Sequence, residues 1–156
     1  GGKIHGGHIL SLMDQIAFAC ASKHSQKYCV TASVNRVDFR SPVEVGELLT
    51  LKAAINYTGR TSMVVGVRVE SQNITTGKKR HCNSSYFTMV AQDDMGKSVA
   101  IPGLLVQDEQ GVRRFARSKI RKEAAFQRDT KFDENNFKAS DYLKSLYDEN
   151  IKIDLK

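Results

Sequence analysis

The chain has 156 residues, of which 40% are hydrophobic and 26% charged, and this composition predicts a soluble globular protein with a real core. Its longest apolar run is shorter than the ~18 residues of a membrane-spanning helix, and no basic segment precedes that run as in a signal peptide. The net charge of +7 favours an anionic partner, such as nucleic acid, an anionic membrane surface or a phosphorylated cofactor.

The first predicted element is a helix from residue 7 to about residue 24. Apolar residues occupy nearly all sides of the segment Ile9–Ala21, which is typical of a buried helix. Gly6 and Gly7 mark its start, where the backbone can turn or a ligand can approach closely.

Residues 30–91 then follow the period of two that is typical of β-strands. The first strand shifts its phase by one between Val34 and Val37, which predicts a bulge near Asn35-Arg36. Three more long strands are predicted around residues 49–57, 63–69 and 80–91, with turns at 58–61 and 75–78 and a short apolar piece at 98–101.

One long helix followed by four or five consecutive antiparallel strands predicts an α+β fold with hairpin connections. A single helix that is apolar on all sides must be wrapped by a curved sheet. We therefore expect one face of the sheet to lie on the helix and the end of the helix to meet a partner subunit.

The C-terminal part differs in composition from the rest. Residues 112–127 predict a basic amphipathic helix, residues 129–136 a polar linker, and residues 140–147 a short docking helix. Residues 150–156 are expected to be loosely ordered. The basic helix is either a solvated face or a contact for an anionic partner, and both interpretations stay open.

Asp14 is the most informative residue, because it lies inside the otherwise apolar segment Ile9–Ala21. None of its neighbours at helical spacing is basic; they are Leu10, Ser11, Ala17 and Phe18. A carboxylate in such surroundings is costly unless a non-local group pairs with it. Asp14 is therefore either a catalytic group or a structural residue bonded to the backbone or to Ser11.

The start of this helix offers a second chemical group. Unpaired N–H groups and partial positive charge at a helix N-terminus can stabilise the oxyanion that forms from a carbonyl or thioester. Asp14 lies ~10 Å along the axis from Gly7, at 1.5 Å per residue. One helix cannot bring both groups to one carbon atom, whereas two helices of a two-fold pair can.

The sequence gives little support for a reactive cysteine, a metal site or a serine or cysteine hydrolase. Cys20, Cys29 and Cys82 lack metal-site spacing and predict reduced thiols in a cytoplasmic protein. His5 and His8 have no further ligand at metal spacing, so no metal is expected. No local signature supports a serine or cysteine hydrolase, although the arrangement itself stays open.

An ordered set of motifs between residues 2 and 103 resembles the hotdog-fold acyl-CoA thioesterases. The motifs are Gly2-x-Ile4-His5-Gly6-Gly7, Leu12-Met13-Asp14, Val30-Thr31-Ala32-Ser33-Val34, Asp38-Phe39, Pro42-Val43, Gly46, Gly59-Arg60-Thr61-Ser62-Met63, Phe87-Thr88-Met89-Val90-Ala91 and Ile101-Pro102. The resemblance implies a hotdog thioesterase domain over residues 1–110 and leaves residues 111–156 as a basic helix and C-terminal tail.

The resemblance also implies an activity and an assembly. It implies hydrolysis of acyl-CoA to CoA and a carboxylic acid, with no cofactor besides the CoA of the substrate. Asp14 matches the catalytic carboxylate, as general base or as nucleophile. Protomers of this family pair into one continuous sheet, and trimers of such dimers are common, so a homodimer or homohexamer is expected. A non-catalytic CoA-binding or regulatory hotdog protein is the alternative, and nucleic acid is not an expected partner because no basic-aromatic stacking pattern occurs.

Further site residues come from the same resemblance. The amides of Gly6 and Gly7 match the stretch that holds the thioester oxygen. The turn Gly59, Arg60, Thr61 and Ser62 matches a stretch near the CoA arm, and Arg60 is expected to contact a phosphate because its guanidinium forks onto phosphate oxygens. Members commonly carry an asparagine three residues before the glycine that matches Gly2, a position that precedes residue 1.

Overall fold

A computed structural model describes residues 2–132, 137–146 and 149–152. The chain divides into two compact units, Gly1–Ser118 and Lys119–Lys156. Parts of the predicted linker (133–136), of the docking helix (147) and of the tail (153–156) lie outside the described residues.

Helix α1 spans Gly6–Ser25 and confirms the predicted N-terminal helix. The ring nitrogen Nδ1 of His5 caps it by accepting a hydrogen bond from the Gly7 N–H. The helix ends at Gln26, which adopts a left-handed φ of 55° and donates its N–H to Ser22 O.

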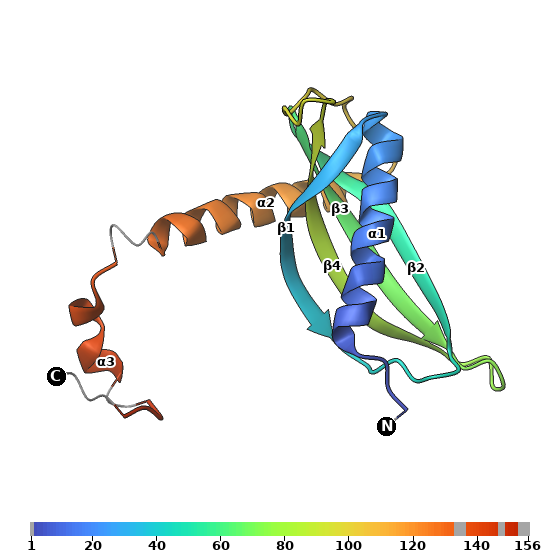
Figure 1. The fold of residues 1–156 in the computed structure, drawn as a ribbon, viewed down its shortest axis with the longest axis horizontal. Coiled ribbons are helices and arrows are strands. Elements are labelled where there is room, and N and C mark those ends of the chain that lie inside the picture. Colours follow the sequence, from blue (N-terminus) through green and yellow to red (C-terminus); the bar gives the residue numbers. More distant parts are fainter. Residues whose placement is uncertain (1, 133–136, 147–148, 153–156) are drawn as a thin grey trace. The chain divides into compact units, whose positions relative to one another are not determined.

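The buried surface of α1 is one narrow stripe. It consists of every fourth residue, namely Ile9, Met13, Ala17, Ala21 and Ser25. The other apolar side chains of α1 are half-buried or exposed, and Phe18 keeps 37% of its surface. The sequence suggested burial on nearly all sides. The protomer instead buries one side of α1, because its sheet lies against that side alone (Figure 1).

The sheet contains four antiparallel strands in the spatial order β1-β4-β3-β2 (Figure 1). They are β1 (Tyr28–Phe39), β2 (Leu48–Thr58), β3 (Ser62–Gln72) and β4 (Lys79–Gln92). The predicted α+β fold, a long helix on a curved antiparallel sheet, is therefore confirmed. The apolar piece at 98–101 contributes one isolated bridge, between Ser98 and Gln92, rather than a fifth strand.

Two irregularities bend β1 where it pairs with β4. The shift between Asn35 and Asp38 confirms the predicted bulge. A second shift, between Thr31 and Ser33, was not predicted. Each extra residue reverses which side chains face the helix, because side chains alternate between the two faces of a strand.

The core lies between α1 and the sheet. Met13 and Ala17 of α1 are fully buried, as are residues of the two central strands, among them Met63, Val65, Val69, Phe87, Met89 and Ala91. Since β3 and β4 are central, about every second residue along them is buried, and most of these buried residues are apolar.

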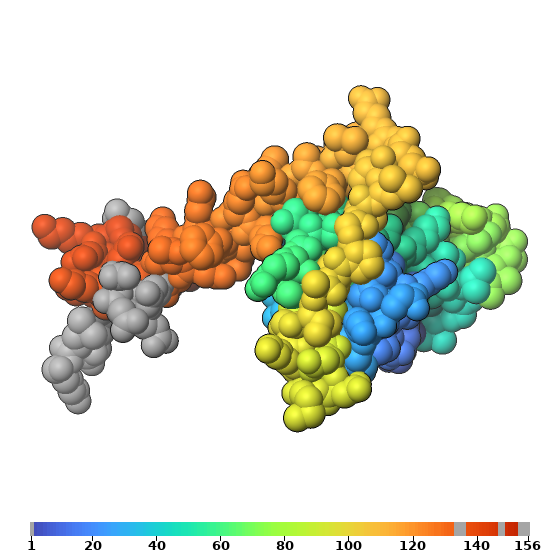
Figure 2. All heavy atoms as spheres, turned by 90° about the horizontal axis from the view of Figure 1, so that it is seen from above, coloured from blue at the N-terminus to red at the C-terminus, as the bar shows by residue number. Residues whose placement is uncertain are grey.

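The segment after β4 crosses the end of the sheet near the end of α1. Ile101 N donates to Arg60 O at 3.0 Å, and a His24 ring nitrogen lies 3.0 Å from Pro102 O. Figure 2, seen from above, shows this segment from yellow to gold beside the green turn and the blue helix.

Three helical elements follow among the described residues. Helix α2 (Glu109–Lys131) begins in the first unit, where Phe115 packs against Tyr57 with ring centroids 4.8 Å apart. The second unit contains the 3-10 helix η1 (Ala139–Asp141) and the short helix α3 (Leu143–Leu146). No helix in the described part of the chain is long and apolar enough to cross a membrane.

The stripe of α1 predicts a large loss of stability when its longest fully buried side chain, that of Met13, is truncated. Met13→Ala should lower the free energy of unfolding by about 2–5 kcal/mol, because Met13 is fully buried and its truncation leaves a cavity between α1 and the sheet. The measurement is urea unfolding at fixed protein concentration. Met95→Ala is the control, since Met95 is 91% exposed; equal losses in both variants would contradict the proposed role of the stripe.

Candidate functional site

The carboxylate of Asp14 has one hydrogen-bond partner among the described residues, and that partner is distant in sequence. Its Oδ1 accepts a 2.6 Å hydrogen bond from Oγ1 of Thr31, which lies 17 residues later on β1. Thr31 Oγ1 also lies 3.4 Å from the sulfur of Met89 on β4. The pair holds the carboxylate in a fixed orientation on the side of α1 that faces β1.

The surroundings of Asp14 are open on one side. Asp14 is half-buried, and β1 is an edge strand whose side chains are mostly exposed. Large apolar side chains are exposed along this edge, including Tyr28, Val34 and Phe39 at 64%, 42% and 55%. Such an edge is a ready template for pairing with another chain. Oδ2 of Asp14 has no hydrogen-bond partner in the described residues and is available to a substrate or water.

At the start of α1, the N–H groups of Gly6 and Gly7, the two predicted oxyanion donors, differ in whether they already have an acceptor. The N–H of Gly7 donates to His5 Nδ1 at 3.2 Å, whereas the described residues provide no acceptor for the N–H of Gly6. Gly6 also lies against Phe39, because a Cβ atom at Gly6 would be 2.9 Å from Cζ of that ring. Gly6 is therefore the open donor of the predicted pair, and Gly7 is the capped one.

A cavity of about 380 Å³ adjoins this helix start. Apolar residues form most of its lining: Ile4, Ile9, Phe39, Pro42, Val43 and Cys82. Gly6 and Asn83 also line it. Asn83 is fully buried, and neither atom of its amide has a hydrogen-bond partner among the described residues.

The predicted CoA-binding turn lies at the other end of α1. Gly59 N donates to Ser62 O at 2.7 Å, which closes the turn, and Ala91 N donates to Thr61 O at 3.1 Å. The side chain of Arg60 is exposed. A helix of 20 residues is about 30 Å long, so one protomer does not bring this turn and Gly6 together.

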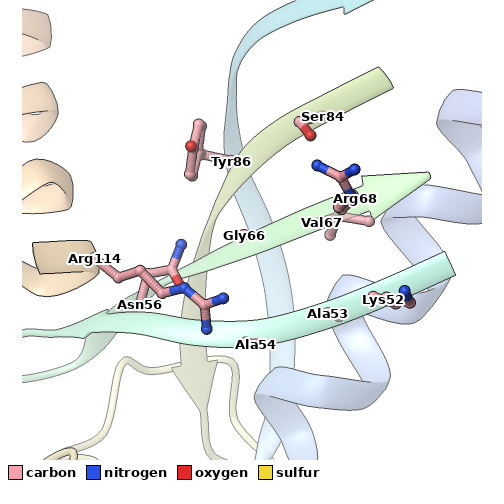
Figure 3. A pocket seen from close by; sticks show the side chains of 10 residues that line it. All are labelled: Lys52, Ala53, Ala54, Asn56, Gly66, Val67, Arg68, Ser84, Tyr86 and Arg114. Atoms are coloured by element: carbon pink, nitrogen blue, oxygen red, sulfur yellow. The ribbon is translucent and has the colours of Figure 1, made fainter. Parts of the chain in front are cut away.

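A second hollow lies on the face of the sheet opposite to α1. It measures about 350 Å³, and Figure 3 shows the ten residues that line it. Lys52, Arg68 and Arg114 make it cationic. Lys52 and Arg68 both bind the Glu70 carboxylate, at 2.6 and 2.7 Å, and these hydrogen bonds hold the pKa of Glu70 at about 2.

Thiol and metal chemistry have weak support from the described side chains. Cys20, Cys29 and Cys82 are free, and burial raises the pKa of Cys20, which disfavours the reactive thiolate. No group of three His, Cys, Asp or Glu side chains that could hold a metal occurs in the described part of the chain.

Thr31 and Asn83 were not singled out from the sequence. The apolar residues Val30 and Ala32 suggested that their side of β1 faces the core, whereas it is Thr31, on the opposite side, that pairs with the buried Met89. Asn83 stands out because it is a polar residue that faces the core. This could be recognised only once the pairing of β4 with its neighbours was known.

The chain resembles known proteins along most of its length. The model of the thioesterase superfamily matches residues 1–78. Protein VdlD of Helicobacter pylori is 43% identical over 120 residues, which are 77% of this chain and 68% of that protein. The crystal structure of an apo-hexameric acyl-CoA thioesterase superposes with a TM-score of 0.79 at 42% identity and covers 81% of both chains.

An acyl-CoA hydrolase of Staphylococcus aureus has a similar structure. It was solved in complex with butyryl-CoA, CoA and CoA disulfide, and it superposes with a TM-score of 0.76 at 29% identity over 94% of this chain and 85% of that one. It was also solved as single alanine variants of an asparagine, an aspartate and a threonine. The replaced aspartate and threonine lie 17 positions apart in that protein, the same separation as Asp14 and Thr31 here.

The cationic hollow predicts a specific titration. Glu70 should titrate with a pKa of about 2 in a carboxyl-carbon NMR titration, and Lys52→Met should raise that pKa because it removes the largest cause of the shift. Since the folded pKa lies below the ordinary value of roughly 4.3, Glu70 contributes stability above that pH and loses it as the pH falls towards 2. The control is Lys97→Met; a wild-type midpoint near 4.3 would contradict the ion pairs.

Proposed function

The chain belongs to the thioesterase superfamily, and on that premise we propose that it hydrolyses an acyl-CoA thioester to CoA and a carboxylic acid. The observation that carries the proposal is the hydrogen bond between Thr31 Oγ1 and Asp14 Oδ1. Its support is the matching separation of the aspartate and threonine that were replaced in the Staphylococcus aureus hydrolase.

Asp14 can act on the thioester in two ways. As general base, its Oδ2 takes a proton from water while the water oxygen attacks the carbonyl carbon. The tetrahedral intermediate then collapses, the C–S bond breaks, and the proton passes to the departing thiolate of CoA. As nucleophile, Oδ2 itself attacks and displaces the thiolate, and water then hydrolyses the mixed anhydride to the acid and free Asp14. Both routes consume one water, and Thr31 orients the carboxylate in either.

Thr31 is a positioning residue in this proposal. Its hydroxyl donates to Oδ1 and so leaves Oδ2 directed to the reacting atoms. A charge-assisted hydrogen bond of this kind is short and strong, which suits the observed 2.6 Å.

We propose that the oxyanion donor comes from a second copy of the chain. Gly7 and Asp14 of one helix are ~10 Å apart along the axis, too far to act on one carbon atom. Asp14 faces the exposed edge of β1, and pairing of two β1 edges would place a second protomer beside it. The open N–H of Gly6 would then serve as the principal donor, with Gly7 and its His5 cap supporting the turn.

The same pairing would also bring the turn Gly59–Ser62 of one protomer to the site of the other. Antiparallel pairing of two β1 strands reverses their direction, so the end that carries Gly59–Ser62 in one protomer would lie beside the start of α1 in the other. Arg60 is then our candidate for contact with a CoA phosphate. The hexameric relative makes a larger assembly, a trimer of such dimers, a reasonable proposal for this chain.

The proposal predicts that Asp14→Asn abolishes turnover, because the amide can neither accept the proton nor attack. A thiol-release assay over short, medium and long acyl-CoAs measures kcat, and size-exclusion chromatography checks that the oligomer persists. Asp94→Asn is the control, since Asp94 is exposed and lies in the turn after β4. Wild-type kcat in Asp14→Asn would exclude the assigned role.

Substitutions of Thr31 should lower kcat by a smaller amount that depends on the replacing residue. Thr31→Val keeps the shape of the side chain but removes the donor to Asp14, so kcat should fall about 10- to 100-fold, as expected for one hydrogen bond to a charged group. Thr31→Ser retains the hydroxyl and should restore most of kcat with little change in KM. If the serine variant is as slow as the valine variant, packing rather than the hydrogen bond is responsible.

A further inference from the structure

Asn83 is a fully buried polar residue whose side chain faces the first turn of α1. On β4 it pairs with Val69 of β3 and with Phe39 of β1. Paired residues point to the same face of a sheet. Val69 is fully buried in the core, and the Phe39 ring lies against Gly6, so this is the face that α1 covers.

The amide of Asn83 has no hydrogen-bond partner among the described residues. Both Nδ2 and Oδ1 are buried, and neither bonds to another described group. The adjacent ring of His81 contacts the backbone oxygen of Asn83 and the Ser84 hydroxyl instead of the amide. A buried unpaired amide costs free energy, and native proteins keep few such groups without a reason.

The cavity beside this amide is otherwise largely apolar. Asn83 and Gly6 line the same space of about 380 Å³. The two cationic residues that also line it, Lys3 and Arg40, are exposed, so water screens their charge. Ser41 also lines the cavity and is half-buried, so Asn83 is the one fully buried polar residue of the lining beside Gly6.

We propose that Asn83 determines specificity by hydrogen bonding a hydroxyl or keto group on a short acyl chain. The inference rests on the proposed thioester hydrolysis and names its substrate class. An asparagine amide offers both donors and an acceptor, which match a hydroxyl, and its donors match a keto oxygen. A site built to bond a substrate hydroxyl discriminates against the analogue without it, because the buried amide then stays unpaired.

The test compares two substrates that differ by one hydroxyl, 3-hydroxybutyryl-CoA and butyryl-CoA. The wild-type protein should show at least about a tenfold higher kcat/KM for the hydroxylated ester. Asn83→Leu, of similar shape but without the amide, should bring the ratio towards one. Ser85→Ala should leave the ratio unchanged, since Ser85 is a buried polar residue of the same strand that bonds Asn35 O rather than lining the cavity.

The outcomes separate this inference from the proposed function. Equal kcat/KM for both esters in the wild-type protein would overturn the inference and leave thioester hydrolysis intact. An equal loss on both esters in Asn83→Leu would also overturn it, because it would assign the amide to the shared CoA arm or to folding. A folded wild-type protein that releases no thiol from any acyl-CoA would contradict the proposed function, and the inference with it. Asn83→Val replaces the leucine variant if the latter does not fold.

Discussion

Helix α1 packs on the sheet through every fourth residue, and this narrow contact decides where the other groups of the molecule lie. Four strands cover one side of a helix, so the stripe with Met13 and Ala17 is buried while the flank with Asp14 stays half-open. The open flank lies next to β1, an edge strand with exposed apolar side chains. A carboxylate on that flank stays half-exposed, and one hydroxyl of the edge strand orients it.

Polar groups on the two sides of the sheet have different environments. On the outer face, Lys52, Arg68 and Glu70 form ion pairs with each other, and water reaches and screens the exposed cations. Between the sheet and α1, the amide of Asn83 has no such partner among the described residues, and most of the cavity that it lines is apolar. The physical cost of a buried unpaired amide is therefore what distinguishes a proposed recognition group from a surface polar residue.

The cationic residues that give the chain its net charge of +7 lie in several parts of the molecule. Part of it lies in the cationic hollow of the first unit, and part lies in α2, which carries many of its arginines and lysines beyond Phe115. Arg60 adds an exposed cation at the end of the sheet. A negatively charged CoA substrate would be attracted by this field at long range, whichever of these cations it contacts.

The sequence by itself determined the order and type of the elements, and it singled out Asp14 as the candidate catalytic residue. Hydrophobic periodicity is a local property, so α1, the four strands and the bulge near Asn35 could be predicted from it. An acidic residue that has no basic neighbour at helical spacing can also be recognised from the sequence alone. The tertiary structure decided which distant residues lie near these groups. Thr31 faces Asp14 because it pairs with the buried Met89 of β4, and Asn83 lies on the face that α1 covers because of its pairing with Val69 and Phe39. Strand register depends on contacts between distant segments, and periodicity within one segment cannot encode it.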